Sequence, residues 1–341
     1  MKKLLSILTI LIIGLILSAC GSSEDETNTS SSTEASESDG PVEIKLGVGY
    51  ATEENLWLMK VASDLAPNYG EKYTLELQQF RANADRLNAY RAGQIHGGTL
   101  GQGASIMSKA QGVDMKVIAN IAKESPDDGF NSAFLASADS DIESAKDLKG
   151  KTVGVVDFKS PTDMWARSAI REAGLDPDKD VEYAVLPIPA MQEAIESGKI
   201  DVGMFPQPFY DMAENSGELK TIFTSKDGVP IEEDFLNLFM EPKFVEENEE
   251  AVQALVSDLQ TMTEYYVNNP EEARQKLLDA EFVLADPEVY LQMEDYARAI
   301  DGSFNREGWD VVQDILLKEE WIEEEVDLDT LIDESFISGD E

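Results

Sequence analysis

The amino-acid sequence predicts an α/β fold with two similar lobes that face each other. From Val42 onward, strand-like runs alternate with amphipathic helical stretches, and this alternation is typical of α/β proteins whose strands are largely parallel. In addition, one run of residues in the first half of the chain recurs about 105 positions later. Each copy would then be one α/β unit, and we expect a ligand cleft between the two units.

The first predicted lobe begins with two strand–helix pairs, which follow from the spacing of its apolar residues. In chain order these are a strand, a helix, a strand and a helix: Val42–Tyr50, Glu54–Leu65, Tyr73–Phe80 and Asn83–Arg91. We expect Asn83 to cap the second helix and Gly93 to end it, because asparagine is favoured at helix N-caps and glycine just after helix C-termini.

The repeated run spans Ala89–Gln102 and Ala194–Gln207 and keeps an alanine, two glycines, an isoleucine and a glutamine at the same spacing. Chance similarity between α/β units is the alternative explanation. If the repeat reflects two equivalent lobes, the loops after their strands converge, because open α/β sheets bind ligands at the carboxyl ends of their strands. These loops are 50–55, 99–103, 157–162 and 205–209.

The N-terminal residues predict a secreted, lipid-anchored protein. Residues 1–20 combine two lysines, an apolar stretch and small residues before Cys20, which is the pattern of a signal peptide. Leu17–Cys20 resembles the lipobox of bacterial lipoproteins, and the resemblance implies cleavage before Cys20 and acylation of this residue. The alternative is an ordinary signal peptide with an incidental cysteine. Residues 21–41 are polar and almost free of aliphatic side chains, so we expect a disordered tether.

Composition excludes several classes of function. The chain carries 68 acidic and 27 basic residues, a formal charge of −41, and so acidic a surface repels nucleic acid and anionic lipid head groups. We therefore expect contact with the membrane through the lipid anchor alone. Cys20 is the only cysteine and His96 the only histidine. Neither a disulfide nor a cysteine–histidine metal site or catalytic dyad is therefore predicted. We expect no cofactor, and a structural role for His96.

Several motifs taken together resemble a family of bacterial solute receptors. They are 91–95 with the glycine-rich loop that follows, Ala110–Ile118, Asp147–Gly154, Ser197–Gly203 leading to Pro208 and Phe209, and Trp321–Asp333. In order and spacing they resemble the nitrate/sulfonate/taurine and thiamine-pyrimidine receptors of ABC importers, across about residues 43–337. The resemblance implies the type II periplasmic-binding-protein fold, in which two lobes joined by hinges close on a ligand in the cleft between them.

For this chain the resemblance implies lobe boundaries and hinges. Lobe 1 would contain residues 42–125 and the returning segment 230–341, and lobe 2 would contain residues 126–229. The hinges would lie near Ser125–Asn131 and Lys226–Leu238. The returning segment would cover lobe 1 with helices over Glu249–Asn268 (capped by Asn248), Pro270–Leu278 and Pro287–Ile300.

The implied function is that of a lipid-anchored receptor on the extracytoplasmic face of the cell membrane. It would bind a small organic molecule, sulfonate- or taurine-like or heterocyclic, and deliver it by hinge closure, as a monomer, to an ABC permease. A separate ATPase would supply the energy, since this chain has no phosphate-binding loop. We expect no enzymatic activity. Two alternatives stay open. One is an enzyme similar to the thiamine-pyrimidine synthases, whose cysteine-rich motif and donor histidine this chain lacks. The other is a solute sensor for a membrane signalling partner.

The residues expected to contact the ligand lie in loops at the strand ends and at the hinge. They are Tyr50, Thr52, Asn55, Phe80, Thr99, Gln102, Asn131, Lys159, Ser160, Thr162, Phe205 and Gln207. Ser160 suits the N-cap and Pro161 the first turn of a helix, so free backbone N–H groups there would hold a ligand's negative or hydrogen-bond-accepting end. Simple helix capping is the alternative. The glutamine amides can both donate and accept, and Tyr50, Phe80 and Phe205 would stack on a flat ligand.

Glu53 and Glu54 are acidic residues beside this expected cleft. The sulfonate receptors tend to carry small residues and glycines here, and two carboxylates near an anion pocket would weaken anion binding. This departure favours a zwitterionic, neutral or weakly cationic organic ligand over a small inorganic anion such as nitrate. Alternatively, both carboxylates begin a helix in the solvated shell, where acidic side chains suit the positive end of the helix dipole.

Overall fold

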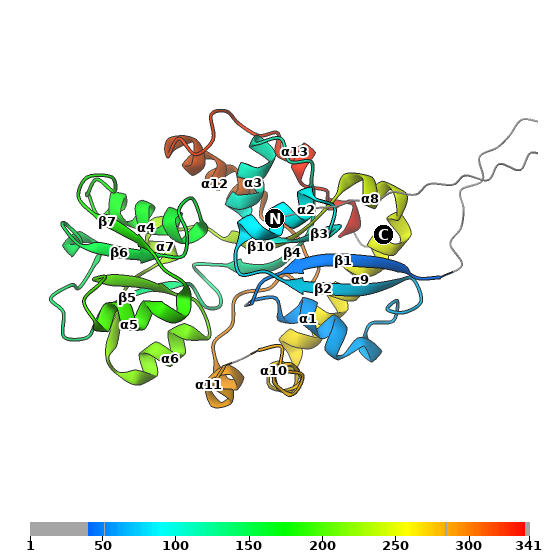
Figure 1. Ribbon diagram of the computed structural model, residues 1–341, viewed down its shortest axis with the longest axis horizontal. Coiled ribbons are helices and arrows are strands. Elements are labelled where there is room, and N and C mark those ends of the chain that lie inside the picture. The colour runs from blue at the N-terminus through cyan, green and yellow to red at the C-terminus, as the bar shows by residue number, and fades with distance from the viewer. Residues whose placement is uncertain (1–39, 51, 284, 338–341) are drawn as a thin grey trace, which may run out of the picture. The chain divides into compact units, whose positions relative to one another are not determined.

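Two five-stranded sheets, each flanked by helices, form the framework of the protein (Figure 1). The structure is a computed structural model that describes residues 40–50, 52–283 and 285–337. The predicted signal peptide, Cys20 and nearly all of the predicted tether lie outside the described residues. Among the helices that are described, none is both long enough and apolar enough to span a membrane.

The first sheet has the strand order β2-β1-β3-β10-β4. Its strands are β1 (Val42–Val48), β2 (Tyr73–Gln79), β3 (Gly97–Leu100), β4 (Lys116–Glu124) and β10 (Glu233–Met240). β1 is parallel to β2 and β3, whereas β10 runs antiparallel to both β3 and β4. All strands except β10 therefore share one direction, as predicted for a largely parallel sheet.

The second sheet repeats this topology with the order β7-β6-β8-β5-β9. Its strands are β5 (Ala133–Ser137), β6 (Thr152–Val155), β7 (Glu182–Val185), β8 (Val202–Phe205) and β9 (Leu219–Thr224). β6 is parallel to β7 and β8, and β5 is antiparallel to β8 and β9. In each sheet, the antiparallel strand is the one that the chain reaches directly after leaving the other sheet.

The repeat detected in the sequence is present in the strand registers. Gly47 of β1 and Gly154 of β6 occupy equivalent places, each paired with a glycine of the next strand. A Cβ on Gly47 would lie 2.7 Å from Cδ1 of Ile95, and a Cβ on Gly154 would lie 2.7 Å from Cδ1 of Ile200. The isoleucines therefore pack on bare backbone, which only glycine exposes. The isoleucine of each repeat therefore makes the same contact in its own lobe, and the prediction of two similar lobes is confirmed.

The chain crosses between the sheets twice. The first crossing, residues 125–132, joins β4 to β5; the second, residues 225–232, contains the short helix α7 (Ser225–Gly228) and leads from β9 to β10. Because of the second crossing, β10 returns to the first sheet and lies between β3 and β4. The predicted hinges overlap both crossings, and their bending stays a prediction.

Helices flank both sheets, and Figure 1 shows α1 and α9 beside the first sheet and α4 and α5 beside the second. Before the second crossing the helices are α1 (Glu54–Val61), α2 (Asn83–Arg91), α3 (Gln102–Ala110), α4 (Pro161–Glu172), α5 (Met191–Glu196) and α6 (Phe209–Ser216). After it they are α8 (Pro242–Glu247), α9 (Glu249–Asn268), α10 (Pro270–Asp279), α11 (Pro287–Gln292), α12 (Arg306–Lys318) and α13 (Leu328–Leu331). Short 3₁₀ turns span Ser63–Leu65, Ala145–Asp147, Ile188–Ala190 and Glu334–Phe336.

One predicted helix cap is wrong, and a second stands at its predicted position without making a capping hydrogen bond. Asn83 is the first helical residue of α2, and Ala82 stands at the N-cap, where it offers no side-chain hydrogen bond. Asn248 does precede α9, but its amide donates to the carbonyl of Phe244 (2.9 Å) and so serves the end of α8. Gly93 has the left-handed φ of 65° that a helix-ending glycine adopts, as predicted.

The helices expected over 54–65 and 287–300 are shorter than predicted. α1 ends at Val61, and its continuation is a separate 3₁₀ turn. α11 ends at Gln292, because the chain turns extended at Met293. The carbonyls of Leu291 and Met293 then accept hydrogen bonds from the guanidinium of Arg274 (3.3 and 2.9 Å). These carbonyls therefore bond to a side chain of α10, and the last turns of helix that were expected here do not form.

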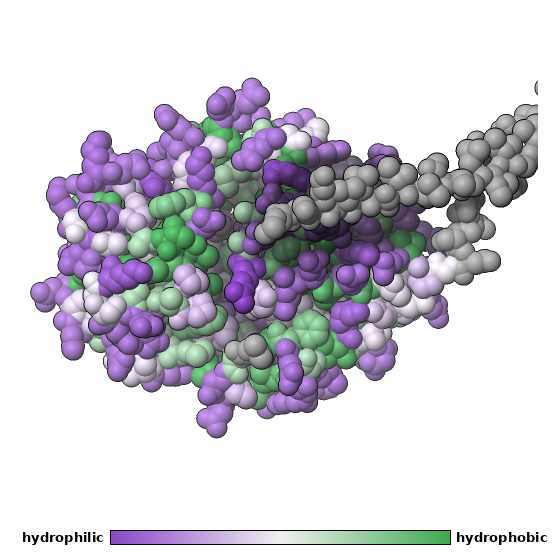
Figure 2. Space-filling model, in the orientation of Figure 1, coloured by the Kyte–Doolittle hydropathy of each residue, from purple (hydrophilic) through white to green (hydrophobic). Residues whose placement is uncertain are grey.

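The apolar core continues from one sheet to the other. One cluster of buried side chains includes Ile106 and Trp309 beside the first sheet, and Trp165 and Val153 in the second lobe. The lobes therefore touch through α3, α4 and α12. Figure 2 shows hydrophilic side chains over much of the visible face, with apolar patches between them.

Candidate functional site

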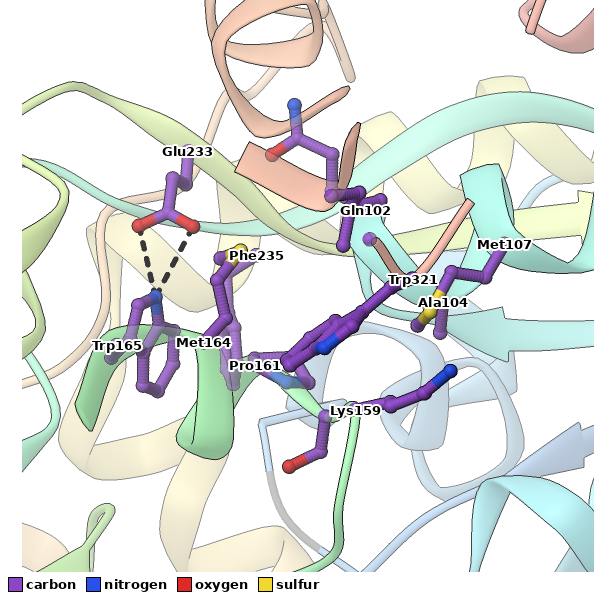
Figure 3. Close-up of a pocket in the computed structure, with 13 residues that line it drawn as sticks. Gln102, Ala104, Met107, Lys159, Pro161, Met164, Trp165, Glu233, Phe235 and Trp321 are labelled. Carbon is purple, nitrogen blue, oxygen red and sulfur yellow. Dashed lines mark hydrogen bonds between the residues drawn. The ribbon is translucent and has the colours of Figure 1, made fainter. Parts of the chain in front are cut away.

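A pocket lies where the two lobes meet (Figure 3). The space between its lining atoms amounts to about 310 Å³, open solvent included. Four segments line it: the start of α3, the start of α4 with the residue pair before it, the start of β10, and the end of α12 with the turn that follows. The lining residues are Gln102, Gly103, Ala104, Met107, Lys159, Ser160, Pro161, Met164, Trp165, Glu233, Phe235, Leu316 and Trp321.

Gln102 is the most informative residue of this pocket. It is the first residue of α3, directly after the loop that ends β3, so the repeat had placed it at a strand's carboxyl end. Its side chain is 3% exposed, and neither the amide nitrogen nor the amide oxygen has a hydrogen-bond partner. A buried polar group without a partner carries a desolvation cost. The Gln102 amide therefore has hydrogen-bonding capacity that no described group of the protein uses.

Glu233 is a buried carboxylate that joins the lobes. It begins β10 directly after the second crossing, and its oxygens accept hydrogen bonds from the indole N–H of Trp165 on α4 (3.2 and 3.1 Å). Its Oε2 also lies 2.5 Å from Nζ of Lys226 on α7. Figure 3 shows the Glu233 carboxylate directed at the Trp165 ring. Glu233 and Gln102 lie in the upper part of this view, and Lys159 lies in the lower part.

The start of α4 has the predicted N-terminal geometry. The Ser160 hydroxyl accepts a hydrogen bond from the backbone N–H of Asp163 (3.4 Å), with Pro161 in the first turn. The same hydroxyl donates to the carbonyl of Asp157 (2.7 Å) and lies 2.8 Å from Oγ1 of Thr162. Thr162 in turn accepts from the backbone N–H of Val156 (3.1 Å). Both side chains therefore organise the loop, and Ser160 also lines the pocket.

Aromatic rings continue from the pocket along the boundary between the lobes. The rings of Trp165 and Phe235 lie 5.7 Å apart, and Phe235 is stacked on Tyr296 at 5.2 Å. Phe130, in the first crossing, then contacts Tyr296 edge-on at 5.4 Å and Tyr210 of α6 at 5.1 Å. A flat ligand in the pocket would extend this series of rings.

Three of the predicted ligand contacts in lobe 1 belong to buried polar networks instead of the pocket wall. The Thr99 hydroxyl donates to Glu53 and accepts from Arg86 (2.9 Å). Asn55 donates to the Thr263 hydroxyl (2.9 Å), and the carbonyl of Thr52 accepts from Arg298 (3.3 Å). A ligand role for these three residues stays a prediction.

The remaining predicted contacts lie at different depths. The side chain of Tyr50 is 55% exposed, Phe80 is half-buried, and Phe205 is packed in the core of the second lobe. Asn131 donates to the carbonyl of Ser125 (2.8 Å) and Gln207 to Asp211 (2.9 Å). Each of these two amides also keeps one buried oxygen without a partner. Of the twelve predicted residues, Gln102, Lys159 and Ser160 are the ones that line the pocket together.

The placement of Glu53 and Glu54 in a solvated shell is wrong, because their exposed fractions are 1% and 3%. Burial raises the pKa of both carboxyl groups, and the charges of Arg86 and Arg298 oppose that rise. Glu54 forms an ion pair with Arg298 at 2.7 Å. The idea of an acidic mouth therefore does not hold as stated, since each carboxylate is matched by a buried cation.

Several pocket residues were not predicted from the sequence. Glu233, Phe235 and Trp321 come from the returning segment, and no spacing rule connects them with α3 or α4. His96 has the structural role that was predicted: its Nδ1 accepts from the backbone N–H of Lys45 (3.2 Å), and its ring stacks on Phe244 at 4.1 Å.

A second hollow, of about 930 Å³ and widely continuous with solvent, lies between α6 and α11. Apart from Val289, its lining is acidic and polar: Asp211, Asn215, Asp286, Glu288 and Gln292. Asp286 caps its own helix by accepting from the backbone N–H groups of Glu288 and Val289 (2.9 and 3.4 Å). We therefore regard the pocket around Gln102 as the candidate site.

Comparisons with known proteins agree with this architecture. The sequence model of a family described as NMT1/THI5 like matches residues 73–273, which is more than half of the chain. No curated protein sequence matches the chain significantly.

Three solved structures illustrate the similarity. The ligand-binding component of an ABC-type import system from Staphylococcus aureus, with zinc bound, has a TM-score of 0.71 and 17% identity, covering 87% of this chain and 98% of that one. The periplasmic aliphatic sulphonate-binding protein SsuA from Escherichia coli has a TM-score of 0.70 and 19% identity, covering 85% and 96%. The periplasmic nitrate-binding protein NrtA from Synechocystis has a TM-score of 0.70 and 15% identity, covering 87% of each chain. At such identities the likeness establishes the fold, and the predicted two-lobed periplasmic-binding-protein fold is confirmed.

Proposed function

The chain belongs to the NMT1/THI5 like family, as its motifs predicted, and on this premise we propose that it is a solute receptor of an ABC importer. It binds a small organic molecule between its lobes and delivers the molecule to a membrane permease driven by a separate ATPase. The names of the solved neighbours, an import component and sulphonate- and nitrate-binding proteins, support this role. Acylated Cys20 holds the receptor on the extracytoplasmic face of the membrane.

The observation that carries the proposal is the unpartnered amide of Gln102. A buried amide that can donate one hydrogen bond and accept another fits a ligand edge with an adjacent acceptor and donor. The rings of Trp165, Phe235 and Trp321 lie around the same pocket and suit a flat apolar ligand body. Among the two predicted ligand classes, these features favour a heterocyclic molecule over a sulfonate.

The proposed mechanism is hinge closure without covalent chemistry. Gln102 belongs to α3 of the first lobe, whereas Ser160 and Trp165 belong to the start of α4 in the second. A ligand that contacts both groups stabilises the closed arrangement over the open one, and the size of that shift equals its difference in affinity for the two states. The permease would recognise the closed arrangement.

A thermal-unfolding screen of the purified protein tests the proposal. The panel contains thiamine pyrimidine, riboflavin, small aromatic acids, taurine, alkanesulfonates, nitrate and bicarbonate. A ligand at a thousand times its Kd stabilises the native state by about 4 kcal/mol, which raises Tm by several degrees.

The variant Gln102→Ala identifies the site. We expect it to lose most of the ligand-induced Tm shift, while its unliganded Tm does not fall, because the variant no longer buries an unpaired amide. Gln111→Ala, at the exposed far end of the same helix, is the matched control and keeps the full shift. A panel without any stabilising compound, or an unchanged shift in Gln102→Ala, contradicts the proposal.

A further inference from the structure

A carboxylate of the chain itself occupies a set of hydrogen-bond donors in lobe 1. Both oxygens of Glu53 accept from the backbone N–H of Gly49 (2.8 and 2.6 Å). One of them also accepts from the hydroxyl of Thr99. Glu53 and Thr99 are fully buried, with exposed fractions of 1% and 0%.

Arg86 supplies a buried positive charge next to these donors. Its Nη1 donates to the hydroxyl (2.9 Å) and to the carbonyl of Thr99. Its side chain is 4% exposed, and its Nε has no hydrogen-bond partner. Nη2 of Arg86 and Oε2 of Glu53 approach the same side of Gly49, at 3.2 and 3.3 Å from the place that a Cβ would take. A guanidinium, a hydroxyl and a backbone N–H around one carboxylate are the groups that bind oxyanions in proteins.

The cluster lies outside the lining of the pocket around Gln102, near the carboxyl ends of β1 and β3. Gly49 follows β1, and Thr99 lies in β3 three residues before Gln102. Figure 1 shows β1 ending on the side of the first sheet that faces the second sheet. Carboxyl ends of parallel strands are where open α/β sheets bind ligands. The donors around Glu53 would therefore be available to a ligand anion if Glu53 were absent.

The equivalent loop of lobe 2 shows that this arrangement is particular to lobe 1. There, Asp163 accepts from the backbone N–H of Lys159 (2.9 Å), also four residues earlier. Its other oxygen, however, accepts from Arg167 on its own helix (2.7 Å). In lobe 1 the carboxylate instead engages donors from separate elements, β3 and the loop after β1, with Arg86 from α2 beside them.

We propose that Glu53 is a built-in ligand: it fills an oxyanion site made by Gly49, Thr99 and Arg86, so that this receptor rejects nitrate- and sulfonate-like anions in lobe 1. The inference rests on the proposed solute-receptor function. It narrows the ligand class to solutes that carry no oxyanion group on the end bound by lobe 1. Removing the carboxylate converts the cluster into a site for a free small oxyanion.

The test compares wild type with Glu53→Ala and Glu53→Gln, the second of which refills the space with a neutral amide. Purified proteins are unfolded thermally in sodium nitrate, methanesulfonate or formate, against sodium chloride at the same ionic strength. We expect these anions to raise the Tm of Glu53→Ala by several degrees over chloride, and to leave wild type and Glu53→Gln unchanged. The double variant Glu53→Ala/Arg86→Met should lose the gain.

Asp258→Ala is the matched control. Asp258 is also fully buried and also accepts from a backbone N–H, that of Asn68 (3.1 Å), but its other partners are the neutral Asn68 amide and Tyr73 hydroxyl. The inference is overturned if Glu53→Ala gains no more from the anions than Asp258→Ala, or if wild type gains as much as Glu53→Ala.

If Glu53→Ala does not fold in chloride, refolding yield in formate against chloride decides the question. Recovery in formate supports the inference, and no recovery overturns it. The organic panel on wild type is scored separately. A gain of anion binding in Glu53→Ala without any organic ligand for wild type would refute the proposed function and leave the oxyanion site standing.

Discussion

Replacing Glu124 with glutamine is expected to stabilise the protein in a pH-dependent way. Glu124 ends β4, just before the first crossing, and is fully buried. Its oxygens accept from the backbone N–H of Ser132 (3.1 Å) and from the hydroxyl of Ser225, so it connects both crossings. Burial raises the pKa of Glu124 to about 7; Glu233 beside it adds to the rise, and Lys226 opposes it.

The sign and size of the effect follow from this pKa. The unfolded carboxyl titrates near 4.5, so between that pH and about 7 the native state holds a proton that the unfolded state has lost. Stability therefore falls as pH rises through this window. A difference of about 2.5 pKa units corresponds to about 3 kcal/mol at most. Between pH 5 and pH 8, the free energy of unfolding of wild type should fall by roughly 2 to 3 kcal/mol relative to the variant.

Glutamine suits the site because it has the shape of glutamate and does not ionise. Its amide oxygen can accept from Ser132, and its amide nitrogen can donate to the Ser225 hydroxyl. Both hydrogen bonds at the crossings are therefore kept in the variant.

Urea unfolding at pH 5 and pH 8 measures the effect. Wild type is compared with Glu124→Gln and with Glu246→Gln, a control at an exposed position of α8. Using differences between proteins cancels the titration of all other groups. A gap between wild type and Glu124→Gln that does not change with pH would refute the reasoning, and so would a variant less stable than wild type at pH 8.

Two further predictions concern buried charge and glycine packing. Arg298→Met should lower the free energy of unfolding by about 3 to 5 kcal/mol, because it leaves two carboxylates without the guanidinium that contacts both. The surface control Lys179→Met should cost under about 1 kcal/mol; urea unfolding of both compares them, and equal losses would contradict the role of burial. Gly47→Ala and Gly154→Ala should each cost about 1 to 3 kcal/mol, because in each case the new Cβ meets an isoleucine methyl at 2.7 Å. Gly40→Ala, with open space around it, is the control in thermal unfolding, and unequal effects at the two packed glycines would argue against equivalent lobes.

Much of the fold could be predicted because its signals are local. Strand and helix positions follow from apolar spacing, and the isoleucine of each repeat packs on a strand glycine fewer than fifty residues earlier in the chain. Asn83 and Asn248 show the limit of such signals. Asparagine is favoured at helix N-caps, but neither side chain caps the helix that follows it. Which backbone group a side chain can reach depends on the folded path of the chain, and the adjacent residues in the sequence do not determine that path.

The candidate site was predictable in part for the same reason. Gln102 stands at a strand end that the repeat identifies, Ser160 stands at a helix N-cap predicted from its own neighbours, and both line the pocket. Glu233 and Trp321 reach the pocket only because the chain returns to the first sheet after completing the second. Glu54 was expected in the solvated shell but is buried. Its cation Arg298 lies 244 positions away in the sequence, so the burial of Glu54 could not be inferred from the residues next to it.

The sequence by itself determined the two-lobed α/β fold, its internal repeat and its family, because each depends on residue types at short, regular spacing. Only the tertiary structure decided which polar groups are satisfied. It left the Gln102 amide without a partner in a pocket between the lobes, and it placed the Glu53 carboxylate on donors from β3 and the loop after β1. Hydrogen bonding and desolvation depend on atoms brought within about 3 Å of each other, and that proximity arises only when distant segments fold together.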